Sequence, residues 1–445
     1  MERAETIYIF KNNIDAFMAW KREYSRILGI WWDGESSIID GFTEWLKPKT
    51  IIVEEELHNL LRKELTNTSL QIIVQQHQPP TKASRLPSSL DLPICVFPSN
   101  DTHVYLFNPV INQMNNYKIC TSKFIREGAR EILIEQGTPF TYLQHRKKDA
   151  SLYNTLVSAN DWGPVEKFTH KEFQKLGVPT ICLQESVIDF GDHLARMEWC
   201  NFPFIQGIVT ARYLPSKILF LTGNPRYEAL SPSSFPSNKH VLINSNFTYG
   251  LYEDIRINWI EDIVQTCAEL GIDYLISQHP RDSGDLSSYN VTDSHAGVVH
   301  DMIRASSVLI SRFSSLIHES IALGRPVIFF NPHGEIMNYD FEPDGVHIFV
   351  SKTREQLRNA LNSIIHNGLE DPLHDPFYKT YGMRHYGATD GKASLRVVNA
   401  LRTVQQASYQ PEGRPITGLQ LRMDLARLRF RLFRTGLGSS KVIKI

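Results

Sequence analysis

The sequence lacks a marked excess of either charge and any long apolar run. Its 47 lysines and arginines nearly balance 48 aspartates and glutamates, which gives a formal net charge of −1. Near-neutral charge gives no support to nucleic-acid binding. No apolar run approaches the roughly 18–20 residues that span a bilayer, and the first residues lack the basic-then-apolar pattern of a signal peptide. We therefore expect a cytoplasmic protein whose membrane contact, if any, is peripheral.

Paired cysteines and metal motifs are also missing. The five cysteines are scattered with no Cys-x-x-Cys spacing, at Cys95, Cys120, Cys182, Cys200 and Cys267. This spacing predicts reduced, mostly buried thiols rather than disulfides or a zinc site. No Asp-x-Asp motif is present, which favours catalysis without a metal ion. We expect no cofactor.

Short β-rich apolar runs alternate with amphipathic helical segments along most of the chain, a pattern typical of parallel α/β units. A length of 445 residues suggests two to three units. The run 231–239 is rich in Pro and Ser, and we interpret it as a domain linker. The sequence thus predicts two Rossmann-like domains, at residues 1–230 and 240–410.

The stretch from Ser306 to Pro332 predicts strand, turn, helix and strand in close succession. Ser314 and Ser315 fall where the helix should begin, so a hydroxyl can cap its free N–H groups. The same N–H groups are suited to binding an anion. A phosphate there would leave a ribose within reach of Glu319, about one turn further along. A simple helix cap is the alternative.

Three loops of the second domain are predicted to converge at the carboxyl ends of its strands, where ligands bind in doubly wound sheets. These loops are 244–250, 277–281 and 312–315. His279 can donate a hydrogen bond to a phosphate, and Pro280 would hold the turn that directs it. Arg281 or Arg312 could neutralise further charge.

The first domain offers its own candidates. Glu185 comes directly after the predicted strand Val178–Leu183, so it should lie at the carboxyl edge of the sheet. A solvated loop glutamate is the alternative. Asp161 and Trp162 stand together in a turn-rich group, and we consider them candidates for the acceptor side.

These motifs resemble GT-B fold glycosyltransferases that use CMP-sugars, and most closely the retaining β-Kdo transferases of O-antigen and capsule synthesis. The resemblance covers about residues 161–332. It is carried by Asp161-Trp162-Gly163-Pro164, Gln184-Glu185, Ser277-Gln278-His279-Pro280-Arg281 and Ser311-Arg312-Phe313-Ser314. More distantly the chain is similar to sialyltransferases, and to CDP-glycerol glycerophosphotransferases, which share a turn like Thr222–Arg226.

The resemblance implies two Rossmann-like domains facing across a crevice, and transfer of Kdo from CMP-Kdo to a glycan or lipid-linked glycan. His279, Ser314 and Ser315 would hold the nucleotide phosphate, and Glu185 would act as acid or base toward the acceptor hydroxyl. Carboxylates on both sides of the sugar suit an oxocarbenium-like transition state.

The nucleophilic carboxylate implied by the resemblance has two candidates, Glu253 and Asp254, at the start of the predicted helix 253–270. The register between them is open.

Residues 411–445 differ from the rest of the chain. Leu419–Leu437 mixes Leu, Met and Phe with five arginines, which is typical of a basic amphipathic helix. Such a helix in 415–445 can lie on the anionic inner face of a membrane. A terminal helix packed on a neighbouring domain or subunit is the alternative.

Three other functions fit parts of the pattern. A CDP-glycerol or CDP-ribitol polyol phosphotransferase would use the same nucleotide motifs. A UDP-GlcNAc 2-epimerase-like enzyme would share Glu319 and the Gly-x-Pro that follows it. A non-catalytic GT-B scaffold would keep the fold without the reaction.

Overall fold

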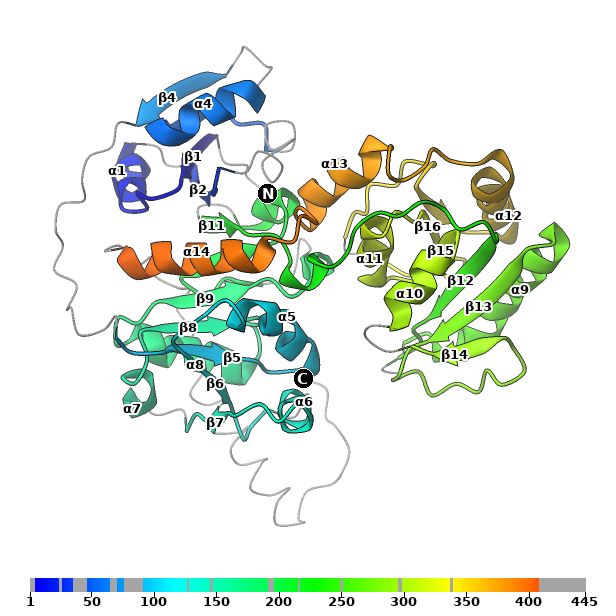
Figure 1. Cartoon of the computed structure of the whole chain (residues 1–445), viewed down its shortest axis with the longest axis horizontal. Coiled ribbons are helices and arrows are strands. Elements are labelled where there is room, and N and C mark those ends of the chain that lie inside the picture. The colour runs from blue at the N-terminus through cyan, green and yellow to red at the C-terminus, as the bar shows by residue number, and fades with distance from the viewer. Residues whose placement is uncertain are drawn as a thin grey trace. The chain divides into compact units, whose positions relative to one another are not determined.

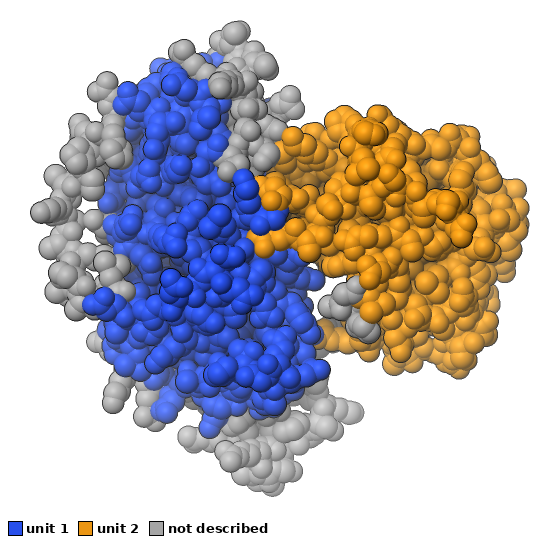
Figure 2. Space-filling model, in the orientation of Figure 1, with its two compact units in different colours: residues 1–226, 391–445 blue, residues 227–390 orange. Residues whose placement is uncertain are grey.

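A computed structural model of the chain contains two compact units, coloured blue and orange in Figure 2. Unit 1 comprises residues 1–226 and 391–445, and unit 2 comprises residues 227–390. The structure describes residues 5–23, 26–34, 46–64, 70–75, 91–125, 128–144, 147–190, 196–214, 217–248, 251–294, 298–336 and 339–407.

Unit 1 is built on an 11-stranded sheet in which all neighbouring strands run parallel, in the order β4-β3-β1-β2-β11-β10-β9-β8-β5-β6-β7. The strands are β1 (Thr6–Phe10), β2 (Ile27–Trp31), β3 (Thr50–Glu54), β4 (Gln71–Gln75), β5 (Ile94–Phe97), β6 (Tyr117–Thr121), β7 (Thr141–Tyr142), β8 (Thr155–Ser158), β9 (Thr180–Leu183), β10 (Phe202–Ile205) and β11 (Ile218–Leu221). Most of these strands are fully buried because helices cover a parallel sheet on both faces.

Within this sheet, β5 to β10 follow the doubly wound order, with β5 and β8 as central neighbours. The chain leaves β5 through α5 (Asp101–Ile111) and β8 through α8 (Pro164–Gln174). The strand order reverses between β5 and β8, so their carboxyl ends are where a ligand is expected.

The last described helix, α14 (Ala393–Gln406), belongs to unit 1 (Figure 1). It buries Val397, Leu401 and Val404 in the same core as the strands. The predicted second domain therefore does not extend to residue 410. It ends at residue 390, because the apolar face of α14 is buried by the sheet of unit 1.

Unit 2 contains a six-stranded parallel sheet in the order β14-β13-β12-β15-β16-β17, which is again the doubly wound order. Its strands are β12 (His240–Ser245), β13 (Asp273–Gln278), β14 (Val291–Asp293), β15 (Val308–Ser311), β16 (Val327–Phe330) and β17 (Ile348–Ser351). Its helices include α9 (Arg256–Leu270), α10 (Val298–Ala305), α11 (Leu316–Ala322), α12 (Arg354–Asn362) and α13 (Pro376–His385). The predicted α/β class with two Rossmann-like sheets is confirmed.

The predicted strand–turn–helix–strand from Ser306 to Pro332 forms β15, α11 and β16. Gly324 follows α11 with a φ of 78°, a left-handed conformation that suits glycine at a helix end. Arg325 and Pro326 then lead directly into β16.

The predicted linker 231–239 is part of unit 2 rather than a loose connection. Arg325 is only 1% exposed, and its guanidinium donates to the carbonyl oxygens of Ser233 and Ser234 at 2.6 and 2.9 Å. These charge-assisted bonds hold the Pro- and Ser-rich segment against the turn between α11 and β16. Composition alone did not indicate this partner.

Two further expectations can be compared with the structure. All five cysteines are buried and unbridged, as predicted. Across the described ranges, no helix is long and apolar enough to cross a bilayer. The predicted basic helix in 415–445 lies outside the described residues, and so does the whole segment 411–445.

We predict that Leu401→Ala will destabilise unit 1, because Leu401 is 2% exposed in the shared core. The expected loss in the free energy of unfolding is about 2–5 kcal/mol, measured by urea denaturation. Gln406→Ala, on the same helix but exposed, is the matched control. Equal stability of the two variants would show that α14 does not contribute to the core.

Candidate functional site

In unit 2 the strand order reverses between β12 and β15, and the predicted nucleotide residues lie at the carboxyl ends of β13 and β15. The loop after β12 contacts both neighbours. The carbonyl of Ser245 accepts a hydrogen bond from the backbone N–H of His279 at 2.8 Å. The side-chain amide of Asn246 donates to the carbonyl of Phe313 at 3.1 Å. The loops that carry His279 and Ser314 are thus joined through one intermediate loop.

His279 begins a tight turn that Pro280 occupies, closed by the N–H of Asp282 on the carbonyl of His279 at 2.8 Å. The ring atom Nδ1 accepts the backbone N–H of Arg281 at 3.0 Å. In a neutral ring the proton therefore lies on Nε2. This tautomer can donate to a phosphate oxygen, as the sequence predicts.

Ser314 and Ser315 precede α11, where the sequence predicts them. Ser314 Oγ accepts the N–H of Leu316 at 3.2 Å, so the predicted capping bond is present. Ser315 makes no side-chain cap of its own. Both serines are half-buried.

Arg312 does not present a free charge at this edge. Its side chain is buried, donates to Glu335 Oε1 at 2.7 Å, and lies over the ring of Phe247 at 4.6 Å from its centroid. The second carboxylate oxygen of Glu335 lies 3.5 Å from Nε2 of His333. Glu335 already neutralises Arg312. We therefore interpret Arg312 as a residue that fixes the loops, rather than as the predicted phosphate contact.

A second buried ion pair supports the His279 turn. The Asp282 carboxylate meets Arg256 at 2.9 Å and accepts the Ser245 hydroxyl at 2.6 Å and the N–H of Phe247 at 3.2 Å. Sequence inspection missed this pair, because the partners lie 26 positions apart and neither belongs to a motif.

The remaining candidates of unit 2 are Glu319, Glu253 and Asp254. Glu319 is buried, and its Oε2 lies 2.7 Å from Nε2 of His300 on α10. This contact occupies one oxygen of the carboxylate predicted to reach a ribose. Glu253 and Asp254 form a short 3₁₀ turn before α9, with Asp254 exposed.

In unit 1, Glu185 follows β9 and meets residues that sequence inspection missed. His103 Nε2 lies 2.9 Å from Glu185 Oε2, and the amide of Asn100 donates to Oε1 at 3.3 Å. His103 Nδ1 accepts the backbone N–H of Ser99 at 3.1 Å, so the neutral ring directs its Nε2 proton at the carboxylate. Asn100 also caps α5 through the N–H of His103 at 2.8 Å.

The surroundings of Glu185 favour its charged form. Burial alone would raise its pKa, but the electrostatic attraction and hydrogen bond from His103, with contributions from Asn100 and Arg226, outweigh burial. The net pKa lies below the ordinary value of 4.5. Glu185 is therefore ionised at neutral pH, the protonation state that a general base requires.

Asp161 is not an acceptor-side group. It is fully buried, and its carboxylate accepts the backbone N–H groups of Met197, Trp199 and Cys200 at 2.8, 2.9 and 3.0 Å. Burial raises its pKa even though these three bonds oppose the rise. Asp161 therefore fixes a loop.

Trp162, the other predicted acceptor-side residue, is half-buried. The guanidinium of Arg196 lies over its ring at 3.9 Å from the centroid. Cation–π stacking of this kind occupies one ring face.

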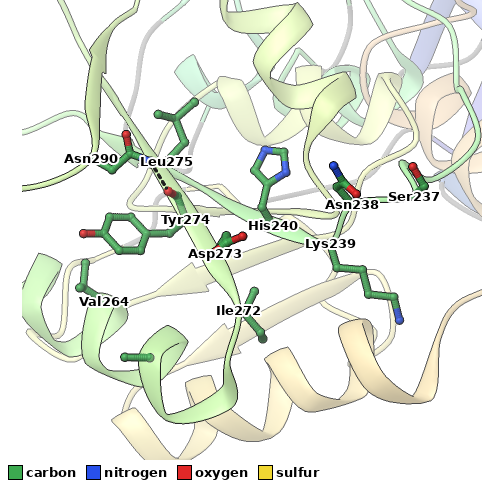
Figure 3. Close-up of a pocket in the computed structure, with 11 residues that line it drawn as sticks. Ser237, Asn238, Lys239, His240, Val264, Ile272, Asp273, Tyr274, Leu275 and Asn290 are labelled. Carbon is green, nitrogen blue, oxygen red and sulfur yellow. Dashed lines mark hydrogen bonds between the residues drawn. The ribbon is translucent and has the colours of Figure 1, made fainter.

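A cavity of about 920 Å³ in unit 2 lies away from these clusters (Figure 3). It is lined by the amino ends of β12 and β13, including His240 and Tyr274, where Asn290 donates to the carbonyl of Tyr274 at 2.8 Å. Ligands of open α/β sheets bind at the opposite edge, so its volume does not make it the candidate site.

Metal ligands do not gather in the part of the chain that the structure describes. There, no group of three or more His, Cys, Asp or Glu side chains is arranged to hold an ion. Metal-independent catalysis stays a prediction.

Comparison with known proteins gives one match to a family model. Residues 250–403, roughly a third of the chain, match the model described as CDP-Glycerol:Poly(glycerophosphate) glycerophosphotransferase. A search of curated proteins found no match.

Solved structures show only distant likeness. The UDP-GlcNAc 2-epimerase from Methanocaldococcus jannaschii is 10% identical, with a TM-score of 0.48 over 70% of this chain and 99% of that one. A variant of the wall teichoic acid polymerase TagF is 16% identical, with a TM-score of 0.46 over 71% of this chain and 90% of that one. The UDP-GlcNAc 2-epimerase from Neisseria meningitidis bound to UDP-GlcNAc is 13% identical, with a TM-score of 0.46 over 69% of this chain and 99% of that one.

The family match supports a transferase. It favours the polyol phosphotransferase alternative over the CMP-Kdo donor that the sequence resemblance implied. The matched segment contains His279, Ser314 and Ser315, but not Glu185.

We predict that ionised Glu185 stabilises unit 1 above its unfolded pKa. Because its folded pKa is lowered, this contribution is present above about pH 4.5 and is lost as the pH falls through the folded pKa. The stability of the wild type relative to Glu185→Gln should shrink as the pH falls below about 4.5, measured by urea denaturation at each pH. A difference that stays constant would contradict the lowered pKa.

Proposed function

We propose that the protein is a transferase that uses a CDP-linked polyol donor and moves the polyol phosphate to a hydroxyl of a glycan or polyol-phosphate acceptor. The proposal rests on the family match at 250–403, which covers most of unit 2, a unit whose sheet has a nucleotide-binding strand order. The donor nucleotide is assigned to unit 2, at the carboxyl ends of β13 and β15.

The residues of unit 2 suit a diphosphate. The backbone N–H of Arg281 fixes the His279 ring through Nδ1, so the neutral ring carries its proton on Nε2. The Arg281 side chain in the same turn is exposed. Ser314 and Ser315 add hydroxyls before α11. Such donors stabilise negative charge that grows on a leaving phosphate.

In the proposed reaction, the acceptor oxygen forms a bond to the β-phosphorus while the bond from that phosphorus to the CMP oxygen breaks. CMP leaves with the electron pair, and the hydroxyl proton passes to Glu185. His103 and Asn100 hold this carboxylate, so we assign them as positioning residues for the base.

Donor preference provides the first test. CDP should raise the melting temperature more than UDP or GDP, since ligand at about 100 Kd adds roughly 2.7 kcal/mol. His279→Ala should lose most of this shift, whereas His366→Ala, an exposed histidine of unit 2, should keep it. A preference for UDP would indicate the epimerase-like function. Turnover of CMP-Kdo with none of CDP-glycerol would restore the sugar transferase.

The assignment of the base predicts a separation of turnover from binding. Glu185→Gln should lower kcat for CMP release from CDP-glycerol by about 10²–10⁴-fold, the usual contribution of a general base. Its stabilisation by CDP should remain. Glu135→Gln, an exposed glutamate of unit 1, is the control. Retention of more than about a tenth of the activity would remove Glu185 from this role.

His103→Gln should change the pH profile. His103 is the main group that opposes the effect of burial on the Glu185 pKa. Without it the Glu185 pKa rises, so the acidic limb of kcat/KM should move to higher pH. A lower rate with an unmoved limb would indicate a purely structural role.

A further inference from the structure

A cavity of about 390 Å³ in unit 1 plays no part in the function proposed above. It lies at the carboxyl ends of β1 and β2, with one wall formed by α14. Lys11 follows β1 directly, Asp33 follows β2 after one residue, and the first turns of α14 supply Lys392 and Arg396. Its volume lies in the range of small-molecule sites.

The lining is strongly cationic. Among the described residues that line it, Lys11, Lys392, Arg396 and Arg402 contribute four positive charges and Asp33 one negative charge. Arg396 is 1% exposed, and its Nε lies 3.8 Å from Asp33 Oδ2. A cleft lined mainly by one sign of charge concentrates the electric field and attracts counter-ions.

The cations stand on a rigid frame. The buried carboxylate of Glu54, at the end of β3, accepts the backbone N–H groups of Lys11, Asn12 and Asn13 at 3.0, 3.1 and 2.6 Å. These bonds fix the turn that carries Lys11. The Trp31 indole donates to the carbonyl of Lys11 at 3.0 Å and holds the same turn from β2.

The register of α14 is set by its other face, which is buried in the core of unit 1. Its cavity face therefore presents Lys392, Arg396, Asn399 and Arg402 at spacings of four, three and three residues, one stripe of a helix. Arg402 donates to Asn399 Oδ1 at 3.1 Å, which holds one cation in place. The amino end of α14 adds positive potential.

We propose that this cavity binds the phosphate or diphosphate group of a small ligand. Paired guanidinium and ammonium groups on a fixed frame are suited to phosphate oxygens, and the strand ends are where open α/β sheets take ligands. The phosphate can come from a nucleoside diphosphate or from a phosphorylated polyol. The cavity shares no described lining residue with the His279 cluster or the Glu185 cluster.

Titration calorimetry of the full chain carrying His279→Ala tests this, because that background removes the proposed nucleotide site. Pyrophosphate, glycerol 3-phosphate and CDP are the probes. We expect at least one probe to bind, and Lys11→Gln and Arg402→Gln each to weaken it about tenfold, as loss of a charge-assisted bond does. Tighter binding of CDP would identify a nucleotide, and tighter binding of glycerol 3-phosphate a phosphorylated polyol.

Lys118→Gln is the matched control, since Lys118 is an exposed cation of unit 1 outside the cavity. Both cavity substitutions are on side chains outside the core, so folding should be kept, which a melting curve verifies. No binding of any probe, or equal affinity in the Lys11, Arg402 and Lys118 variants, would overturn the proposal.

Discussion

Parallel pairing of the strands is the constraint on which the rest of the molecule depends. It brings the carboxyl ends of all strands in a sheet to one edge, and loops that are distant in sequence meet there. The His279 and Ser314 loops, the Glu185 cluster and the Lys11 cavity all lie at such edges. The two sheets thus offer three groups of polar side chains, each at the end of adjacent or nearly adjacent strands.

Carboxylates at these strand ends serve different purposes, and their partners distinguish them. Glu54 and Asp161 accept mostly backbone N–H groups and are almost fully buried, so they fix loops. Glu185 accepts from the side chains of His103 and Asn100, and its side chain keeps 18% exposure. This accessible carboxylate, whose donors include a titratable group, is the one that we propose as the proton acceptor.

The sequence predicts the parts of the structure that depend on neighbours along the chain. The 306–332 unit and the position of Glu185 after a strand both follow from local patterns. Long-range partners could not be predicted in this way. Arg325 binds Ser233 from 92 positions away, and an amphipathic helix such as α14 carries no mark of the sheet that buries it. The Glu185–His103 contact spans 82 positions, and only the Asn100 cap near a strand end could have drawn attention to it.

The return of α14 to unit 1 has a consequence for synthesis on the ribosome. Unit 2 is one continuous segment, 227–390, whereas the core of unit 1 is complete only after residue 407 has been made. Domains generally fold as units and from the amino terminus onward, but here the earlier unit lacks a helix until the later one has emerged. Until then, the nascent chain exposes the apolar surface that Val397, Leu401 and Val404 will cover. A chaperone or another apolar segment would bind at this surface.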